Sequence, residues 1–580
     1  MMNLNPDQRA AGKACFDAEV SRRNFLKAGV ATGVVAGGGL GAFYFGYEKA
    51  LGSPVRVGVI GTGDEGNILL GAINPEFLEV KAICDIRPYN RFRAFHGEVG
   101  QPLRPGLISV YHWKSEAEAL RHVSVYKGSY EELLANAKRD GLEAVIIALP
   151  LHLHAPAAVA AMRAGLHVIT EKLMGHTVHE CKEMARTAQE TKRYLATGHQ
   201  RHYNILYANA MDTIQRGILG ELHYIRAQWH RGNLPGKDSW QQPLPPGVKD
   251  ENNDPKTNKL SKELEACEKE LAKASGSAID RLEKQIAQVK AQIEDEILHK
   301  KDESGKTKAE LLGYERKVIK DASGKVIYDR PAIEELIRWR LWDRTGAGLM
   351  AELGSHQLDA SSIFVSAMKG SKTQHPHPLN VVAAANRPIF PADRDVEDHV
   401  YCVIEFPTPE YDAKDDFARR KKIAVQYASI NGNGFGGYGE IVYGTKGTLI
   451  LEREQEVMLF KGPAAASTIK VSGGAGGPTM DTQASGAAHP SAASSSGKEA
   501  PVSKGYAEEL EHWAWCIRHP APQNQPRCRP EVALGDAVIA LVTNMAARQG
   551  KRIEFKEEWF DIDSDDTPED VKPDLTRYQA

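Results

Sequence analysis

The chain has 580 residues, seven cysteines and a net charge of −3 at neutral pH. This length accommodates two or more domains and a sizeable core, and the balanced charge excludes a broad basic surface for nucleic acid. The cysteines show no C-x-x-C spacing, which argues against a disulfide framework. Only Cys516 and Cys528 could pair, and we expect them to stay unpaired.

Residues 1–53 are predicted to be an N-terminal tail with an export signal. Residues 21–27, S-R-R-N-F-L-K, form a twin-arginine motif, and a Gly- and Ala-rich apolar stretch follows it to about Tyr47. The stretch is only mildly apolar for a membrane span, so the paired arginines favour a twin-arginine signal. No A-x-A cleavage site precedes Val55, so the segment is either cut imprecisely or kept as an anchor. We expect a periplasmic or exported protein, with the twin-arginine translocation machinery as a partner.

A strand, a glycine-rich turn and a helix are expected next. Residues 55–60 are mostly apolar, as in a strand buried on both faces of a parallel sheet. The pattern G-x-G-x-x-G follows at Gly61, Gly63 and Gly66. The first glycine allows the tight turn, the second lets the backbone approach a pyrophosphate, and the third lets the next helix pack closely. That helix, expected over residues 64–72, directs its N-terminal N–H groups at the phosphates.

A second apolar strand, residues 77–84, ends at an acidic residue. Asp85 lies close to the offset of about 20 residues that is expected for the acid binding the adenosine ribose. The full context of strand, turn, helix and strand therefore predicts a dinucleotide site. Asp85 accepting from the ribose 2′-OH favours NAD, whereas Arg87 could instead meet a 2′-phosphate, so NADP stays open.

Strands and helices alternate as far as about residue 200 and then give way to a different pattern. The alternation predicts an α/β fold with a doubly wound parallel sheet of Rossmann type over residues 54–200. Longer alternating strands predict an α+β domain with an open, largely antiparallel sheet over residues 201–555. These strands are expected at residues 222–229, 381–387, 398–406, 422–430, 440–443 and 448–452, with helices returning at 506–518 and 530–548.

Two insertions interrupt the second domain, and a tail follows it. Residues 246–335 are highly charged, and 262–298 favours a helical hairpin, which suits a solvated face or an oligomer contact better than a catalytic element. Residues 464–505 are rich in Gly, Ala and Ser and predict a flexible surface insertion. Residues 556–580 are acidic but lack the glycine and closing glutamate of a calcium loop, so we expect a solvated tail.

Two motifs carry the chemistry. Glu171 and Lys172 fall at the C-terminal end of a strand, the edge at which open α/β sheets bind ligands. A lysine buried beside a nicotinamide ring can act as acid or base toward a hydroxyl. Further along, Glu352 and His356 are four residues apart and are expected to share a helix face with Asp359. A histidine with a carboxylate one turn away is oriented and tuned for proton transfer.

These motifs resemble those of the Gfo/Idh/MocA oxidoreductases, which include glucose–fructose oxidoreductase and inositol dehydrogenase. The resemblance runs from about residue 55 to 555, without the two insertions. Residues 171–174 resemble the family's E-K-P motif with Leu173 replacing proline, and residues 346–359 resemble its G-G-G-x-L-x-D-x-G-x-H-x-x-D segment with Glu352 replacing aspartate. Residues 150–154 resemble its T-P-N-x-x-H turn and 198–201 its G-x-Q-R strand end. Losing the proline would loosen the strand end that aims Lys172, and the longer glutamate would change the pocket depth.

The resemblance implies an NAD(P)-dependent oxidoreductase whose substrate is a small-molecule sugar or polyol. Lys172, Glu352 and His356 would be catalytic, with His356 or Lys172 removing the hydroxyl proton as a hydride passes to the nicotinamide. The expected cofactor-binding residues are Gly61, Gly63, Asp64, Glu65, Gly66, Asp85, Arg87, Leu149, Pro150, His154, Glu171, Lys172 and Gln200. The expected substrate-binding residues are Arg201, Arg231, Trp342, Arg344, Glu352 and His356.

Two other functions fit the same residues. Some members of the family oxidise a sugar ring transiently, cleave a glycosidic bond and return the hydride, so a glycoside hydrolase or lyase with a retained cofactor is the first alternative. For the exported protein we expect a tightly bound NAD(P) in either case. A non-catalytic sugar-binding protein on the same fold is the second alternative. We expect no metal site, because His152 and His154 alternate as zinc ligands can but have no third ligand nearby in the sequence. The family also implies a homo-oligomer, dimer or tetramer, formed through the C-terminal sheet.

Overall fold

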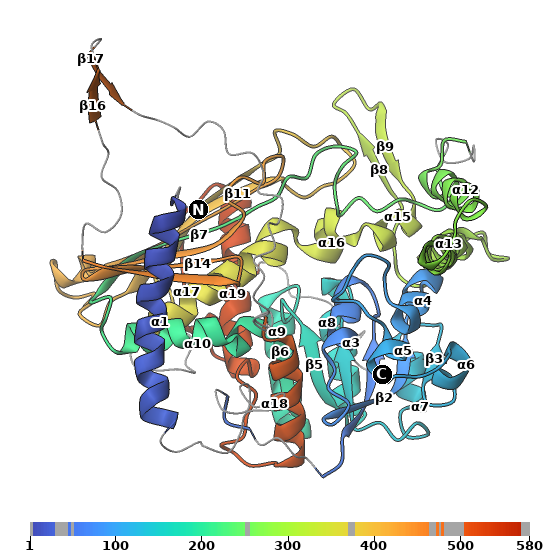
Figure 1. Ribbon diagram of the computed structural model, residues 1–580, viewed down its shortest axis with the longest axis horizontal. Coiled ribbons are helices and arrows are strands. Elements are labelled where there is room, and N and C mark those ends of the chain that lie inside the picture. Colours follow the sequence, from blue (N-terminus) through green and yellow to red (C-terminus); the bar gives the residue numbers. More distant parts are fainter. Residues whose placement is uncertain are drawn as a thin grey trace.

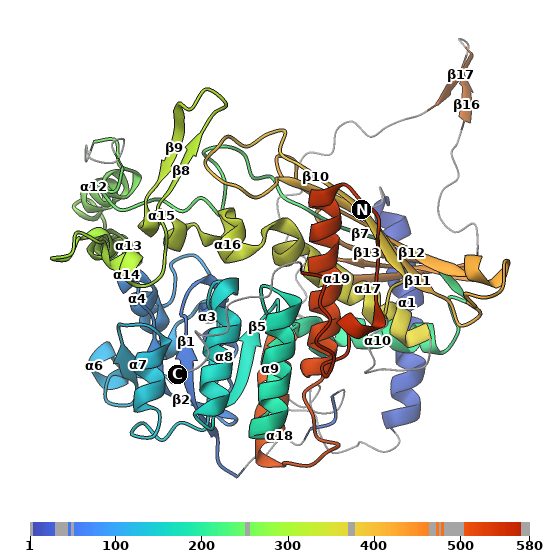
Figure 2. The same ribbon diagram turned by 180° about the vertical axis from the view of Figure 1, so that it is seen from behind.

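The computed structural model describes residues 4–28, 45–47, 52–249, 256–368, 377–462, 471–474, 477–480 and 504–569. The molecule has two domains, and each is built on one large sheet (Figures 1 and 2). The predicted α/β class is confirmed, with a parallel Rossmann sheet followed by a mixed, largely antiparallel one. All seven cysteines are free, as expected.

The first domain is built on a six-stranded sheet in the order β3-β2-β1-β4-β5-β6. Every pair in it is parallel. The order reverses beside β1, so the edge at the carboxyl ends of β1 and β4 is the crevice where such sheets bind ligands. The strands are β1 (Val55–Ile60), β2 (Leu78–Cys84), β3 (Ser124–Tyr126), β4 (Ala144–Ile147), β5 (His167–Glu171) and β6 (Leu195–Gly198).

Helices cover both faces of this sheet, as its fully apolar central strands require. One apolar cluster joins β1 to α3 and α18, and another joins β4 and β5 to α7, α8 and α9. Short helices α5 and α6 follow α4 at the β3 end of the sheet (Figure 1). The bounds are α3 (Asp64–Ala72), α4 (Pro88–His96), α5 (Leu107–Val110), α6 (Glu116–Ala119), α7 (Tyr130–Asn136), α8 (His154–Arg163), α9 (Val178–Thr191) and α18 (Tyr506–Arg518).

The second domain is built on an eight-stranded sheet in the order β15-β14-β13-β7-β12-β11-β10-β18. All its pairs are antiparallel except β7 with β12, which run parallel. Along β11 and β12 buried and more exposed residues alternate, as expected for strands with one face packed in the core and one more exposed face. The strands are β7 (Leu222–His230), β10 (Asn380–Asn386), β11 (His399–Pro407), β12 (Lys422–Ile430), β13 (Tyr438–Gly444), β14 (Gly447–Glu452), β15 (Glu456–Lys461) and β18 (Ile553–Glu554).

Three helices lie between the two sheets: α10 (Ile205–Gln215), α17 (Ser355–Met368) and α19 (Pro530–Gln549). Helix α17 packs on β7, and α19 packs on α9, α17 and β10, so they join the two domains (Figure 2). Among the helices of the described residues, α19 alone is long and apolar enough to cross a membrane. Its apolar window is 83% buried inside the protein, as in a core helix.

The charged insertion is folded and docks on the first domain. The predicted helical hairpin is present as α12 and α13, and α13 packs on α4 of the Rossmann domain. The insertion therefore belongs to the folded body and is not merely a solvated face. Its elements, with the segment that follows, are α12 (Lys259–Leu271), α13 (Ser277–Glu294), η3 (Asp295–His299), α14 (Lys308–Leu311), β8 (Lys317–Lys320), β9 (Val326–Arg330), α15 (Ala332–Ile337), η4 (Trp339–Leu341), α16 (Asp343–Gly346) and η5 (Met350–Gly354).

The N-terminal segment forms helix α1 (Pro6–Ala28), which packs on β15 (Figure 1). The twin-arginine residues fall within this helix, and most of the apolar stretch after them lies outside the described residues. Further on, Phe45 and Tyr47 are buried against the Rossmann domain, where the Tyr47 hydroxyl donates to Glu511 at 2.6 Å.

The expectations for the Gly- and Ser-rich insertion and for the acidic tail have different outcomes. Most of the Gly- and Ser-rich insertion lies outside the described residues; the described part is a small hairpin, β16 (Val471–Gly474) with β17 (Gly477–Met480). The acidic tail does not lie free in solvent over residues 556–569. Lys182 of α9 donates to the carbonyl oxygens of Glu558, Ser564 and Asp566, and this anchors the tail on the Rossmann domain.

Candidate functional site

A cavity of about 500 Å³ opens at the carboxyl edge of the Rossmann sheet, between the two domains. The loops after β1, β2, β4 and β5 form one wall, and β7, η5 and the start of α17 form the other. Of the predicted residues, those that line it are Gly61, Gly63, Asp64, Glu65, Asp85, Leu149, Pro150, His154, Glu171, Lys172, Gln200, Arg231, Glu352 and His356. The position is the one at which open α/β sheets bind nucleotides.

The glycine-rich turn fits a pyrophosphate closely. Gly61 has φ +86°, and a Cβ there would lie 2.3 Å from the Ala148 carbonyl oxygen. A Cβ on Gly66 would lie 2.2 Å from the Gly61 carbonyl oxygen, which explains the need for glycine at the packing position. A Cβ on Gly63 would meet nothing nearer than 3.8 Å, so this residue faces open space. Helix α3 begins there with no side-chain cap, which leaves its first N–H groups for an anion.

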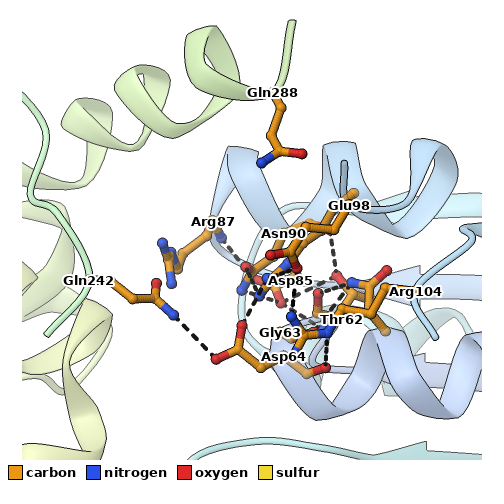
Figure 3. A network of polar contacts seen from close by, with 12 residues as sticks. Thr62, Gly63, Asp64, Asp85, Arg87, Asn90, Glu98, Arg104, Gln242 and Gln288 are labelled. Carbon is orange, nitrogen blue, oxygen red and sulfur yellow. Dashed lines mark hydrogen bonds and ion pairs between the residues drawn. The ribbon is translucent and has the colours of Figure 1, made fainter. Parts of the chain in front are cut away.

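Asp85 is fixed at the end of β2 by four hydrogen bonds (Figure 3). Its Oδ2 accepts from the Thr62 backbone N–H at 2.8 Å and from Asn90 Nδ2 at 3.0 Å. Its Oδ1 accepts one hydrogen bond, from the Arg87 backbone N–H at 2.8 Å. A carboxylate oxygen can accept more than one hydrogen bond, so Oδ1 keeps capacity for a ribose hydroxyl. The residues present therefore fit an NAD molecule.

Arg340 contacts both Asp64, beside the glycine-rich turn, and Glu352, on the opposite wall of the cavity. Its Nη1 lies 3.2 Å from Asp64 Oδ2, and its Nε donates to Glu352 Oε1 at 2.8 Å. Asp64 also pairs with Arg93, at 2.8 Å. Although burial opposes ionisation, Arg93, Arg340 and Arg104 hold the pKa of Asp64 well below its usual value. The first residue of α3 is thus an anion whose charge is fully matched by guanidinium groups.

Lys172 and Glu352 face each other across the cavity. Lys172 Nζ donates to the Glu352 carbonyl oxygen at 2.7 Å and lies 3.6 Å from its Oε2. Burial would raise the pKa of Glu352, but Lys172, Arg340 and Arg231 outweigh it and lower this pKa to about 2. Glu352 is therefore ionised at neutral pH. It holds the lysine ammonium by its main chain and its side chain together.

His356 lies on the same wall, at the start of α17. Its ring packs on Trp229 with centroids 5.5 Å apart. Burial, Lys172 and Arg201 hold the pKa of His356 well below its usual value, so the imidazole is neutral at pH 7. A neutral imidazole can accept a proton from a hydroxyl. The expected support from Glu352 is not made: residues 350–354 form a π-helical turn, and the Glu352 carboxylate contacts Arg340 and Lys172.

His154 positions two of the cavity loops. Its Nδ1 lies 2.8 Å from the Leu173 carbonyl oxygen and its Nε2 lies 2.8 Å from the Leu149 carbonyl oxygen. Both ring nitrogens thus face the main chain. Leu173, expected to loosen the strand end, is 1% exposed, and the peptide bond between it and Lys172 is cis. The His154 ring thus contacts the loops that follow both β4 and β5.

Two glutamates, Glu65 and Glu171, line the cavity together with Lys172. Burial raises the pKa of Glu65 and of Glu171, and their proximity raises the pKa of Glu171 further, while Lys172 opposes both effects. Tyr506, at the start of α18, hydrogen-bonds Glu65.

Five predicted residues lie outside the cavity lining: Gly66, Arg87, Arg201, Trp342 and Arg344. Gly66 acts in packing, as its predicted role requires. Arg201 is 1% exposed, and it donates to Glu454 and to the His356 carbonyl oxygen, which places it behind the site. Trp342 is fully buried, and Arg344 pairs with Glu335. Arg87 pairs with Asp295 of the charged insertion at 2.8 Å.

The sequence analysis missed Trp339, Arg340 and Tyr506, which line the cavity. Trp339 and Arg340 belong to the same W-R-L-W-D-R run from which Trp342 and Arg344 were chosen. The short helices η4 and α16 turn the first pair toward the cavity and the second pair away. The tryptophans and arginines of this run indicated a binding segment, but the sequence did not show which of them would face the cavity. Nothing in the sequence marked Tyr506.

Asp359, expected on the cavity face, lies behind the site. Its Oδ1 is 2.8 Å from His202 Nε2, and its Oδ2 is 3.6 Å from His199 Nδ1. Asp536 of α19 lies beside it, and burial together with Asp359 raises the pKa of Asp536 well above its usual value. A shared proton therefore offsets the repulsion between these two buried carboxyl groups.

Residues 55–199 match the GFO_IDH_MocA family, described as "Oxidoreductase family, NAD-binding Rossmann fold". The first domain is therefore an NAD-binding Rossmann domain of oxidoreductase type. A "Glycosyl hydrolase family 109 protein" of Solibacter usitatus is 28% identical over 219 residues, which cover 37% of this chain and 46% of the relative. One from Shewanella baltica is 31% identical over 230 residues, 36% of this chain and 46% of the relative. The chain thus spans about half the length of the curated relatives it matches.

Two solved structures match most of this chain at low sequence identity. The aldose–aldose oxidoreductase of Caulobacter crescentus, complexed with glycerol, is 16% identical, with a TM-score of 0.47 over 87% of this chain and 100% of that one. The inositol dehydrogenase homolog of Azotobacter vinelandii, complexed with NADH and myo-inositol, is 15% identical, with a TM-score of 0.49 over 87% and 98%.

Proposed function

We propose that this protein is an NAD-dependent oxidoreductase that removes a hydride from a hydroxyl-bearing carbon of a sugar or polyol. One observation carries the proposal: Lys172, Glu352 and His356 meet in the cavity that begins at the NAD-binding turn. The ammonium is held by a carboxylate whose pKa is lowered, and the imidazole beside them is neutral. These are the groups that removal of a hydroxyl proton requires.

Each side chain has a separate task. Bound NAD would supply the hydride acceptor, at C4 of its nicotinamide ring. The neutral imidazole of His356 accepts the substrate hydroxyl proton. Lys172, fixed by Glu352, donates a hydrogen bond to the substrate oxygen and stabilises the negative charge that develops there. Arg231, whose guanidinium lies over Trp229 and Trp240, offers further donors and an aromatic wall to a hydroxyl-rich ligand.

A second candidate is glycoside cleavage, in which the hydride is returned after the bond is broken and no net oxidation occurs. The name shared by the curated relatives favours it, although they match only part of this chain. The cavity also favours it: walls from both domains and from the charged insertion surround the cofactor position, which suits a retained cofactor. Both candidates use the same first step on the sugar carbon.

Export and self-association are part of the proposal. The twin-arginine motif supports recognition by the twin-arginine translocation machinery and a periplasmic location, with or without a retained N-terminal anchor. For self-association, the outward face of β10 and β11 carries exposed apolar side chains on paired strands. Val382 and Val403 are register partners, 49% and 42% exposed, and Tyr401 lies nearby. Such a patch favours a homodimer or tetramer.

Native purification of the exported full-length protein tests the proposal. Mass spectrometry and fluorescence identify any bound dinucleotide and its redox state. The protein is then incubated with myo-inositol, aldoses and 4-nitrophenyl glycosides, and NADH and nitrophenol are both measured. Net NADH formation supports the oxidoreductase; nitrophenol release without net NADH supports the glycosidase. Binding of sugar with neither product, and without exchange of a carbon-bound deuterium, would instead identify a non-catalytic binding protein.

A further inference from the structure

The charged insertion forms part of the wall around the adenosine end of the NAD site. Leu312, Tyr314 and Leu336 line the cavity. Ile86, which directly follows Asp85, packs against the apolar cluster that contains Tyr314 and Leu336. The insertion therefore reaches the end of β2, where the adenosine ribose of a bound dinucleotide lies.

Hydrogen bonds connect the insertion, and the segment just before it, to the loops of the Rossmann domain. Gln288 of α13 accepts a hydrogen bond from the Val99 backbone N–H at 2.9 Å. Gln242, just before the insertion, donates to Asp64 Oδ2 at 3.2 Å. Figure 3 shows both glutamines approaching the network around Asp64 and Asp85 from elements outside it. The insertion is thus held in a defined position beside the nucleotide loops.

Asp295, which directly follows α13, pairs with Arg87, the arginine two residues after Asp85. Its Oδ2 accepts from Arg87 Nε at 2.8 Å, and its Oδ1 accepts from the Tyr89 backbone N–H at 3.1 Å. The Asp295 side chain is 1% exposed and that of Arg87 is 9% exposed. Neither residue lines the cavity, and Figure 3 shows the Arg87 side chain extending away from the Asp85 network.

We propose that Asp295 makes the site selective for NAD over NADP by holding Arg87 away from the ribose and neutralising its charge. This inference rests on the NAD-binding function. A 2′-phosphate carries a charge of about −1.5 to −2 at pH 7 and needs a free cation to offset the nearby Asp85 carboxylate. With Arg87 paired to Asp295, the phosphate would meet the Asp85 carboxylate without a free guanidinium from Arg87 to offset it. A 2′-hydroxyl meets no such penalty, because it donates to Asp85.

The residues that select the cofactor therefore come from two distant parts of the chain. The Rossmann motif supplies Asp85 and Arg87, which alone leave the choice of cofactor open. The insertion supplies the residue that decides it. Asp295 also accepts from Tyr89 in the first turn of α4, where Arg87 is the N-cap and provides no side-chain cap. This second contact fixes the carboxylate in the position that captures Arg87.

The test compares equilibrium binding of NAD+ and NADP+ to the full-length protein stripped of cofactor, by isothermal titration calorimetry. The wild type is expected to bind NAD+ at least about 100-fold more tightly. Asp295→Asn keeps the shape of the side chain but removes its charge, and it should lower this ratio about tenfold or more. Adding Arg87→Gln to Asp295→Asn should restore the ratio. Glu294→Gln removes an exposed charge one residue away and is the matched control.

The outcomes separate the inference from the function on which it rests. Equal affinity of the wild type for both cofactors, or an unchanged ratio in Asp295→Asn, would overturn the inference while NAD binding stands. Failure of the wild type to bind either cofactor would overturn the function itself. If Asp295→Asn does not fold, Arg87→Gln alone decides. An unchanged ratio supports capture of the arginine, and a selective loss of NADP+ affinity would show that Arg87 reads the phosphate.

Discussion

Replacing Glu352 by glutamine tests the electrostatic design of the site. The carboxylate is ionised because Lys172, Arg340 and Arg231 lower its pKa from 4.5 to about 2. A difference of about 2.5 in pKa corresponds to about 3 kcal/mol of folding free energy at about 1.4 kcal/mol for each factor of ten. The Glu352 side chain is 18% exposed, so solvent screens part of this. We expect Glu352→Gln to destabilise the folded protein by about 2 to 3 kcal/mol at pH 7.

The lowered pKa of Glu352 fixes the direction in which its contribution to folding stability changes with pH. A carboxyl group whose folded pKa is lowered contributes its full stability above pH 4.5 and loses it as the pH falls toward about 2. At pH 4 the advantage of the wild type over Glu352→Gln should therefore shrink by about 0.8 kcal/mol. For a chain of this length the difference at pH 7 amounts to about 2 °C in the thermal midpoint.

Differential scanning calorimetry of the cofactor-free protein at pH 7 and pH 4 measures both effects. The matched control is Glu294→Gln, which removes an exposed carboxylate and should leave the midpoint unchanged. Equal midpoints for Glu352→Gln and wild type at pH 7 would refute the reasoning. So would a gap between them that widens from pH 7 to pH 4.

Three further predictions concern the reaction and the cofactor. Lys172→Met should lower the rate of hydride transfer by about 10² to 10⁴, while the Kd for NAD, measured by fluorescence, changes little; an unaltered rate would remove the lysine from the mechanism. Because the pKa of His356 is lowered, the imidazole stays a competent base as the pH falls from 8 to 6.5, and kcat/KM should be flat over that range; a decline centred at pH 6.5 would contradict this. Gly66→Ala, with its Cβ 2.2 Å from a carbonyl oxygen, should destabilise the fold, whereas Gly63→Ala should keep the thermal midpoint and weaken NAD binding about tenfold; equal effects of the two substitutions on the midpoint would argue against the pyrophosphate cradle.

The elements with strong local signals were predictable from the sequence. The β1–α3 turn needs glycine for steric reasons that the G-x-G-x-x-G spacing already expresses, and it forms as expected. The helices 506–518 and 530–548 were predicted within one residue of their observed ends. The second begins at Pro530 and is followed by Gly550, which are local signals for the start and the end of a helix. The carboxyl-edge position of Lys172 follows from the strand that precedes it.

The pairings between distant residues were not predictable. Helical periodicity placed Glu352 beside His356, but the π-helical turn at residues 350–354 changes the phase and turns Glu352 toward Arg340. Arg87 seemed available to a phosphate because nothing local neutralises it. Its partner, Asp295, lies 208 residues later, and only the docking of the insertion brings the two together.

The order of strands in the second sheet bears on how the chain folds during synthesis. Strand β7 lies at the centre, between β12 and β13, and Tyr224 is in register with Ala424. When β7 leaves the ribosome, both of its neighbours are about 200 residues from being made, so it must wait unpaired while the Rossmann domain folds. Closing so long a loop slows nucleation of the sheet.

Helix α1 has the longest delay between its synthesis and its packing. It is made first, yet it packs on β15, which follows more than 400 residues later, and Lys13 there pairs with Glu456. Its docking surface exists only when almost the whole sheet has assembled. Docking of the N-terminal helix is therefore a late event that marks completion of the fold, and protection of its amides from hydrogen exchange would report that moment.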